Sequence, residues 1–372
     1  MYWGRFWGLV TSSGALHTNP PAPGSSAFFC VTRNPLSLTL SPPLPLLSLT
    51  PPHPPTHKQL VHAGVANYYG GANKNMGGAF LLAWKICDGK LPGLRDPRDA
   101  DQSESKEDAG GSIAAQRARI NCEATGAGKV VRKVSPEEMV DSALAAFVKV
   151  RVDVNNANQD GSLGEYLHHP KMRQLFGPDF QVVMGFGLHI GWAIEGAIGS
   201  KYKMDVSYLS PNVNMSARLE AATHQFSTAM LISEWVVGEL SQQARDLCRL
   251  VDRVTVVGSQ IPMKLYTFDI FTFPRYIFEP QFNKSGEQER VTWDDSSVQG
   301  LRAGVDPSFF STFDEAVQEY MGGRWDKART LLDQCRAMKD NDGPTESLTK
   351  VMAALQWTAP ADWKGYRALT NK

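Results

Sequence analysis

Residues 185–218, GFGLHIGWAIEGAIGSKYKMDVSYLSPNVNMSAR, decide the fold of this chain. Large apolar side chains alternate with Gly187, His189 and Gly191, and this period of two predicts a strand with one apolar face and one nearly bare face. A second strand and a turn follow, and Pro211 opens a helix. The predicted apolar face of the first strand consists of Phe186, Leu188, Ile190 and Trp192.

The helix that follows carries two polar side chains on one face. Asn214 and Arg218 are four residues apart, so both leave the helix on the same side. An amide and a guanidinium near a helix N-terminus can bind a reacting phosphoryl group. Such a pair alone is more often part of a solvated face or a cap. The surrounding sequence therefore has to show whether this pair binds a phosphate.

The whole string resembles the catalytic domain of the class III nucleotidyl cyclases, in which a Gly-rich strand pair leads into an Asn-x-x-x-Arg helix. The resemblance extends over residues 58–272, with an insertion at 88–133. Its other matching segments are Tyr69–Phe80, Arg218–Ala221, Met230–Ser233 and the hairpin Val251–Ile270. The family implies an α+β fold with a ferredoxin-like core. It also implies the conversion of ATP or GTP to a 3′,5′-cyclic monophosphate and pyrophosphate.

In this family the catalytic site lies between two domains. Two aspartates of one domain hold two divalent ions, Mg²⁺ or Mn²⁺, and the other domain recognises the nucleotide. The resemblance assigns base recognition to Lys74 and Ser207, orientation of the ribose to Asn214, and stabilisation of the phosphate charge to Arg218. Lysine with serine at the two base-reading positions indicates ATP.

Three departures from the family pattern concern the metals and the triphosphate. Gly78 replaces the hairpin aspartate, and the first acidic residue of the chain is Asp88, so no upstream metal aspartate is present. Val257 replaces the lysine that binds the terminal phosphates. Because carboxylates bring divalent ions to phosphate oxygens, we expect this chain alone, as a monomer or homodimer, not to cyclise ATP.

Two interpretations of these departures stay open. The chain resembles the second catalytic half of mammalian membrane adenylyl cyclases, and it could complete a site as a heterodimer with an intact cyclase domain. Alternatively, it is a non-catalytic pseudo-cyclase that acts as a dimerisation or regulatory scaffold.

Composition limits the partners and the compartment. The 372 residues contain 38 basic and 38 acidic side chains, which argues against nucleic acid as a partner. Five cysteines without paired spacing indicate reduced thiols in the cytoplasm, or on the cytoplasmic side of a membrane if the protein is longer. No apolar run is long enough to predict a transmembrane segment.

Residues 1–57 differ from the rest, since they hold eleven of the 23 prolines and no acidic residue. Such a segment is expected to be disordered or polyproline-like. A transit peptide is a second interpretation, although arginines are few. A third is an incorrectly predicted exon, because the family carries a strand with a metal-binding aspartate at about this distance upstream.

The remaining sequence predicts an order of strands and helices. Strands are expected at Val61–Tyr69 and on both sides of Gly77-Gly78, and the charged stretch 88–133 is expected to be a flexible insertion. A capping box at Ser135–Glu138 opens a helix that directs Met139, Leu144, Phe147 and Val148 to the core. Further on, Ser233 is expected to cap a helix, and residues 248–270 to form a hairpin around Gly258.

The C-terminal extension, 273–372, is expected to contain a helical hairpin. Helices at Phe313–Met321 and Asp326–Met338 flank a Gly-Gly turn. A single tetratricopeptide-like unit is one interpretation, but a hairpin packed on the cyclase core is favoured because one repeat cannot form a solenoid. Ala328, Leu331, Leu332 and Cys335 share one side of the second helix, and Trp357 and Trp363 are expected to anchor the unit.

Overall fold

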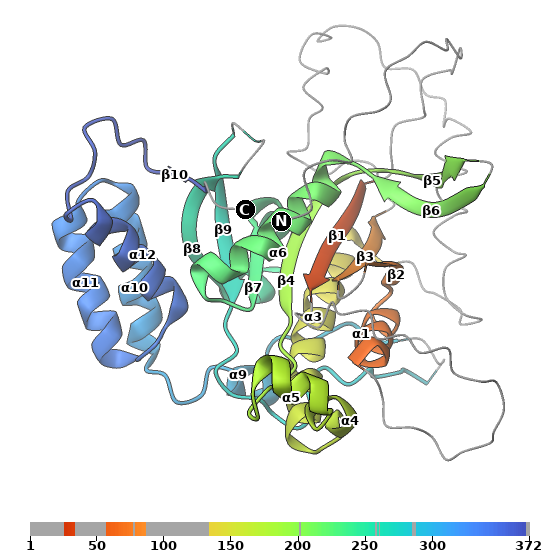
Figure 1. Ribbon diagram of the computed structural model, residues 1–372. Coiled ribbons are helices and arrows are strands. Elements are labelled where there is room, and N and C mark those ends of the chain that lie inside the picture. The colour runs from red at the N-terminus through yellow and green to blue at the C-terminus, as the bar shows by residue number, and fades with distance from the viewer. Residues whose placement is uncertain are drawn as a thin grey trace, which may run out of the picture.

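The computed structural model describes residues 26–33, 57–76, 79–86, 134–200, 202–256, 259, 261–284 and 288–369. It has the expected α+β architecture, built on an eight-stranded mixed sheet and a separate two-stranded ribbon (Figure 1). The sheet order is β10 (Arg367–Ala368), β8 (Cys248–Thr255), β9 (Met263–Phe268), β7 (Met230–Ser233), β4 (Gly185–Trp192), β1 (Ser26–Arg33), β3 (Ala79–Ile86) and β2 (Gly71–Met76). The ribbon pairs β5 (Ile194–Ser200) with β6 (Lys203–Leu209).

Strand β1 corrects one expectation, because the sequence placed it inside a disordered segment. Its backbone pairs antiparallel with β3 on one side and with β4 on the other (Figure 1). The stretch SAFFCVTR is rich in β-branched and aromatic residues and contains no proline, which suits a central strand. The local composition therefore outweighed the proline-rich surroundings. The rest of 1–56 lies outside the described residues.

The predicted strand Val61–Tyr69 is also wrong. Helix α1 covers His57–Ala66 instead. Val61, Val65 and Tyr68 are buried, and spacings of four and three residues place them on one helical face rather than on alternating sides of a strand. This face packs against α3 (Pro136–Gln159).

The paired strands of both predicted hairpins are present in the structure. Strands β2 and β3 pair antiparallel, as do β8 and β9. The turn residues Gly77, Gly78 and Gly258, together with Val257 and the whole insertion 88–133, lie outside the described residues.

Two long helices cover opposite faces of the sheet. Helix α3 begins as predicted, with the Ser135 hydroxyl accepting a hydrogen bond from the Glu138 backbone amide at 3.2 Å. Its Leu144, Phe147 and Val148 are fully buried, and Met139 packs at the edge of the same cluster. Helix α6 (Pro211–Phe226) packs on the other face, against β4 and β1 (Figure 1).

The nearly bare face of β4 is where α6 approaches. A Cβ atom on Gly187 would lie 2.2 Å from the Ser216 carbonyl oxygen, so only glycine permits this contact. Phe186, Leu188 and Ile190 are buried on the opposite face as predicted. Trp192 is not, because the strand runs past the core at its end and leaves that side chain 42% exposed.

The helical hairpin of the C-terminal extension is confirmed. Helices α10 (Pro307–Met321) and α11 (Trp325–Met338) are followed by α12 (Gly343–Ala354), and together they bury their own cluster, which includes Leu250 of β8. The indole nitrogen of Trp363 donates to the carbonyls of Tyr320 and Met321 at 3.2 and 3.1 Å. Strand β10 then joins β8 in the main sheet.

Shorter helices complete the fold: α4 (Gly164–Leu167), α5 (Pro170–Phe176), α7 (Glu234–Glu239), α8 (Gln242–Asp246) and α9 (Ser296–Gly300). None of the described helices is both long and apolar enough to cross a membrane.

Candidate functional site

The N-terminus of α6 is fixed to the end of β4 by hydrogen bonds. Ser210 is the N-cap; its hydroxyl accepts from the Asn212 amide at 3.0 Å and donates to the Trp192 carbonyl at 2.6 Å. The Asn212 side-chain amide donates to the same carbonyl at 3.0 Å. A capped first turn of this kind holds the next turn, which carries Asn214, in a set orientation.

His189 adds a second connection beneath the same turn. Its Nε2 lies 3.2 Å from Asn212 Oδ1 and its Nδ1 lies 3.0 Å from Ser233 Oγ. Because Asn212 Oδ1 can only accept, Nε2 carries the proton and Nδ1 accepts from the serine hydroxyl. Burial lowers the pKa of His189 to about 4, so the ring is neutral near pH 7.

The Ser233 hydroxyl therefore hydrogen-bonds to His189 and does not cap the helix that follows it. It occupies the N-cap position of α7 as predicted, but its side chain makes no capping hydrogen bond.

Asn214 and Arg218 project from the solvent side of α6. The buried face of this helix is formed by other residues, among them Ser216, Leu219 and Glu220. Asn214 is exposed and Arg218 is partly exposed. Neither side chain makes a recorded hydrogen bond or ion pair with the described residues, so both are available to a phosphate or a ribose.

Lys74 and Ser207 lie where β2 meets the ribbon. The Lys74 ammonium forms an ion pair with Asp205 at 3.4 Å, and both side chains are 40% exposed. Asn73 donates to the Val206 carbonyl at 3.3 Å. Since alternate residues of a strand share a face, Ser207 lies on the same face of β6 as Asp205.

The structure thus brings Lys74 to the neighbourhood of Ser207. Within the described residues, no recorded contact joins this pair to Asn214 or Arg218.

Asp205 is the residue that sequence reasoning missed. Its spacing of two residues from Ser207 was the available signal, but the side-chain contact between β6 and β2 depends on tertiary structure. The resulting arrangement is a lysine and a carboxylate side by side at an exposed edge, a combination that can donate to and accept from a polar ligand.

The described residues contain no group of three or more His, Cys, Asp or Glu side chains that could hold a metal ion. The sequence of strand β1, Ser-Ala-Phe-Phe-Cys-Val-Thr-Arg, contains no carboxylate. Gly78, where the resemblance led us to expect a second metal ligand, lies outside the described residues. Because magnesium and manganese are usually bound through carboxylate oxygens, the described residues do not fit a pair of these ions.

No family model matches the chain. Among curated proteins it is similar to an adenylate cyclase of Anabaena cylindrica, with 31% identity over 87 residues, covering 23% of this chain and 17% of that protein. It is also similar to the terminal-differentiation-specific adenylate cyclase of Dictyostelium discoideum, with 28% identity over 86 residues, covering 23% of this chain and 4% of that protein. The match therefore spans well under two thirds of either relative.

Solved structures with a similar arrangement include a bacterial light-regulated adenylyl cyclase, with 16% identity, a TM-score of 0.39, and coverage of 66% of this chain and 51% of that chain. Another is the adenylyl cyclase CyaB from P. aeruginosa, with 16% identity, a TM-score of 0.34, and coverage of 65% and 92%. Likeness at these scores decides nothing about function. From the curated matches and its α+β architecture, the chain fits a class III nucleotide cyclase domain.

Proposed function

We propose that residues 58–272 form an adenylyl cyclase-type domain that supplies the nucleotide-recognition half of a shared site. In this assignment Lys74 and Ser207 contact the adenine base, Asn214 orients the ribose, and Arg218 stabilises negative charge on the reacting phosphate. The reaction is the conversion of ATP to 3′,5′-cyclic AMP and pyrophosphate. An intact partner cyclase domain contributes the carboxylates for Mg²⁺ or Mn²⁺.

The observation that carries this proposal is the contrast between α6 and β1. Helix α6 is held by Ser210, Asn212 and His189 while its Asn214 and Arg218 remain unengaged. Strand β1 is present in the sheet but carries no acidic residue. The chain therefore retains groups that bind a nucleotide and lacks those that bind its metal ions.

The β5–β6 ribbon supports association with a second cyclase domain. It projects beyond the main sheet (Figure 1). The exposed fractions of its large apolar side chains are 49% for Ile194, 86% for Tyr202, 70% for Met204, 64% for Val206 and 54% for Leu209. Met204 and Val206 lie on one face of the ribbon, and Ile194 and Leu209 lie on the other. Large apolar side chains exposed on both faces favour a protein partner.

The test is a pair of activity assays. The purified chain with ATP and Mn²⁺ should form no cyclic AMP above background, because it lacks the metal carboxylates. Mixed with an intact homologous cyclase domain that is itself inactive without a partner, it should give activity that Arg218→Ala abolishes and Lys171→Ala, an exposed control on α5, preserves. Activity of the chain alone, or equal activity of both variants, would contradict the proposal.

A non-catalytic scaffold is the second candidate. It is favoured by the C-terminal helical unit, whose buried cluster is continuous with the edge of the sheet at Leu250. In that case the chain should co-elute with an intact cyclase domain in size-exclusion chromatography, and Arg218→Ala should alter neither the complex nor the partner's activity.

A further inference from the structure

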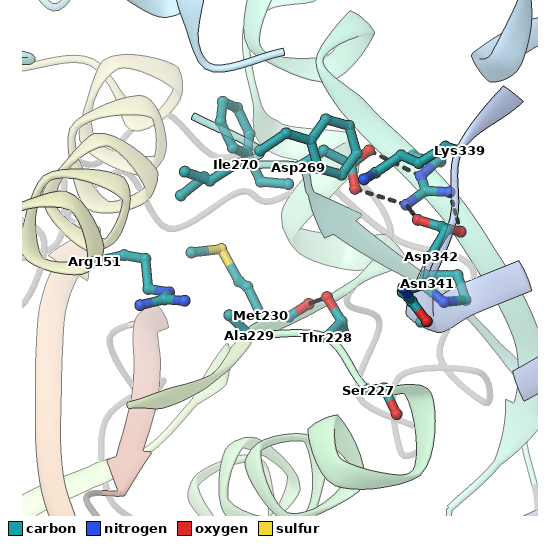
Figure 2. A pocket seen from close by; sticks show the side chains of 15 residues that line it. Arg151, Ser227, Thr228, Ala229, Met230, Asp269, Ile270, Lys339, Asn341 and Asp342 are labelled. Atoms are coloured by element: carbon teal, nitrogen blue, oxygen red, sulfur yellow. Dashed lines mark hydrogen bonds and ion pairs between the residues drawn. The ribbon is translucent and has the colours of Figure 1, made fainter. Parts of the chain in front are cut away.

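A cavity of about 200 Å³ lies where the C-terminal helices meet the main sheet. Its walls come from α3, from the start of β7, from the end of β9 and from the α11–α12 turn (Figure 2). It is separate from the residues assigned above to the nucleotide, since none of them lines it. This volume is below the usual range for drug-sized ligands but large enough for a small ion with its waters.

Two cations line the cavity, and neither has an acidic partner among the described residues. Figure 2 shows Arg151 and Lys339 coming from opposite sides. The Arg151 guanidinium lies 5.1 Å from the ring centre of Phe273, and the Lys339 ammonium lies 4.4 Å from that of Phe271. Neither makes a recorded ion pair with the described residues.

The two carboxylates on the cavity wall are already neutralised. Arg249 forms paired hydrogen bonds with Asp269, at 2.8 and 2.7 Å, and with Asp342, at 3.0 and 2.8 Å. Arg302 approaches Asp269 at 3.8 Å. The charges of Arg249 and Arg302 balance those of the two aspartates, so the positive charges of Arg151 and Lys339 are not compensated by the carboxylates on the cavity wall.

Arg151 is partly buried. Desolvation lowers its pKa, and no carboxylate of the described residues raises it. On the same helix Asp153 is paired with Lys149 instead. A cation that is partly withdrawn from water is stabilised by an anionic partner, so the lack of a counter-charge among the described residues points to a ligand.

We propose that this cavity binds a small oxyanion of phosphate size between Arg151 and Lys339. The planar guanidinium offers paired donors to two oxygens, and the ammonium supplies a point charge from the opposite wall. The Asn341 side chain also lines the cavity and can donate through its amide.

The site touches the helix that carries Asn214 and Arg218. A Cβ atom on Gly343 would lie 2.2 Å from the Ser227 carbonyl oxygen, so the start of α12 presses directly on the C-terminal end of α6. Ser227, the C-cap of α6, and Thr228 both line the cavity. An oxyanion in this cavity would therefore lie in contact with both the C-terminal end of α6 and the C-terminal extension.

The test is calorimetric titration of the full chain with inorganic phosphate, with chloride of equal ionic strength as the reference. Binding should be saturable, and Arg151→Gln and Lys339→Gln should each weaken it by about tenfold or more, the loss of one charge-assisted contact. Lys350→Gln, an exposed change on α12, should leave it unchanged.

Two outcomes would overturn the proposal. These are the lack of saturable binding by the wild type, and an affinity equal to that of the wild type in both cavity variants. Lys339 lies on a partly exposed turn, so its variant is expected to fold even if Arg151→Gln does not.

Discussion

His189 on β4 donates from Nε2 to Asn212 Oδ1 on α6 across 3.2 Å. Asn212 is two residues before Asn214, so the histidine helps to set the first turn of the helix that carries the proposed ribose and phosphate groups. The same ring accepts from Ser233 at the junction of β7 and α7. One neutral imidazole thus connects three elements beneath the candidate site.

Replacing this ring should affect both stability and position. His189→Leu would leave Asn212 Oδ1 and the Ser233 hydroxyl without partners, at a cost of about 1–3 kcal/mol in the free energy of unfolding. Urea denaturation measures this loss. In the mixed-domain assay, kcat should fall more than KM rises, and His189→Gln should recover part of the activity. A variant with unchanged stability and activity would rule out a positioning role.

His189 also predicts a pH dependence of stability. Burial lowers its pKa to about 4 from the ordinary value of 6.5, so the unfolded chain binds the proton more readily than the folded one. Its contribution is therefore present above pH 6.5 and is lost as the pH falls toward about 4, by about 3 kcal/mol in total. The pH profile of the unfolding free energy should be steeper in the wild type than in His189→Leu. Parallel profiles would show that the ring does not titrate in this way.

The close approach of α6 to β4 requires glycine at position 187. In Gly187→Ala the new methyl group would meet the Ser216 carbonyl oxygen at 2.2 Å and the Glu220 amide nitrogen at 2.3 Å. These are backbone atoms, so the helix has to move, at a cost of about 1–3 kcal/mol. Gly196→Ala on β5 is the matched control, because nothing lies within 4 Å of its added carbon. Equal urea midpoints for the two variants would contradict the close packing.

The buried ion pairs of Arg249 attach the C-terminal extension to the main sheet. Arg249→Met would leave Asp342 buried without a counter-charge and Asp269 with Arg302 at 3.8 Å, and the free energy of unfolding should fall by about 3–5 kcal/mol. Arg336→Met breaks a partly exposed pair with Glu346 and should cost less than about 1 kcal/mol. Chemical denaturation of both variants makes the comparison. A loss no larger in Arg249→Met than in the control would show that the buried network is not needed.

The sequence predicted those features that depend on local patterns. The capping box at Ser135, the alternation of Phe186 with Gly187, and the apolar side of α11 each appear in a few adjacent residues. The errors have a common cause. Helix α1 was missed because Val61–Tyr69 was taken as a strand, although the spacings of four and three residues between Val61, Val65 and Tyr68 suit a helical turn better.

Features that depend on tertiary pairing could not be predicted. Strand β1 is stabilised by hydrogen bonding to β3 and β4 on both sides, which its proline-rich flanks conceal. Arg249 joins residues 20 and 93 positions away, and no local pattern indicates such partners. The pairing of Lys74 with Asp205 depends on β2 lying beside β6, 131 positions away.

That last pair gives the most direct test of base recognition. Lys74 and Asp205 are each 40% exposed, so their ion pair contributes under about 1 kcal/mol to stability and leaves both groups accessible to a ligand. In the complex with an intact cyclase domain, Lys74→Ala should weaken binding of a non-hydrolysable ATP analogue by about tenfold, the loss of about one hydrogen bond to a charged group. Lys85→Ala is the matched control, because it removes a comparably exposed pair with Glu195. Both variants should unfold at the same urea concentration as the wild type. If Lys85→Ala weakens the analogue as much as Lys74→Ala does, the loss comes from general charge at this edge, and Lys74 does not read the base.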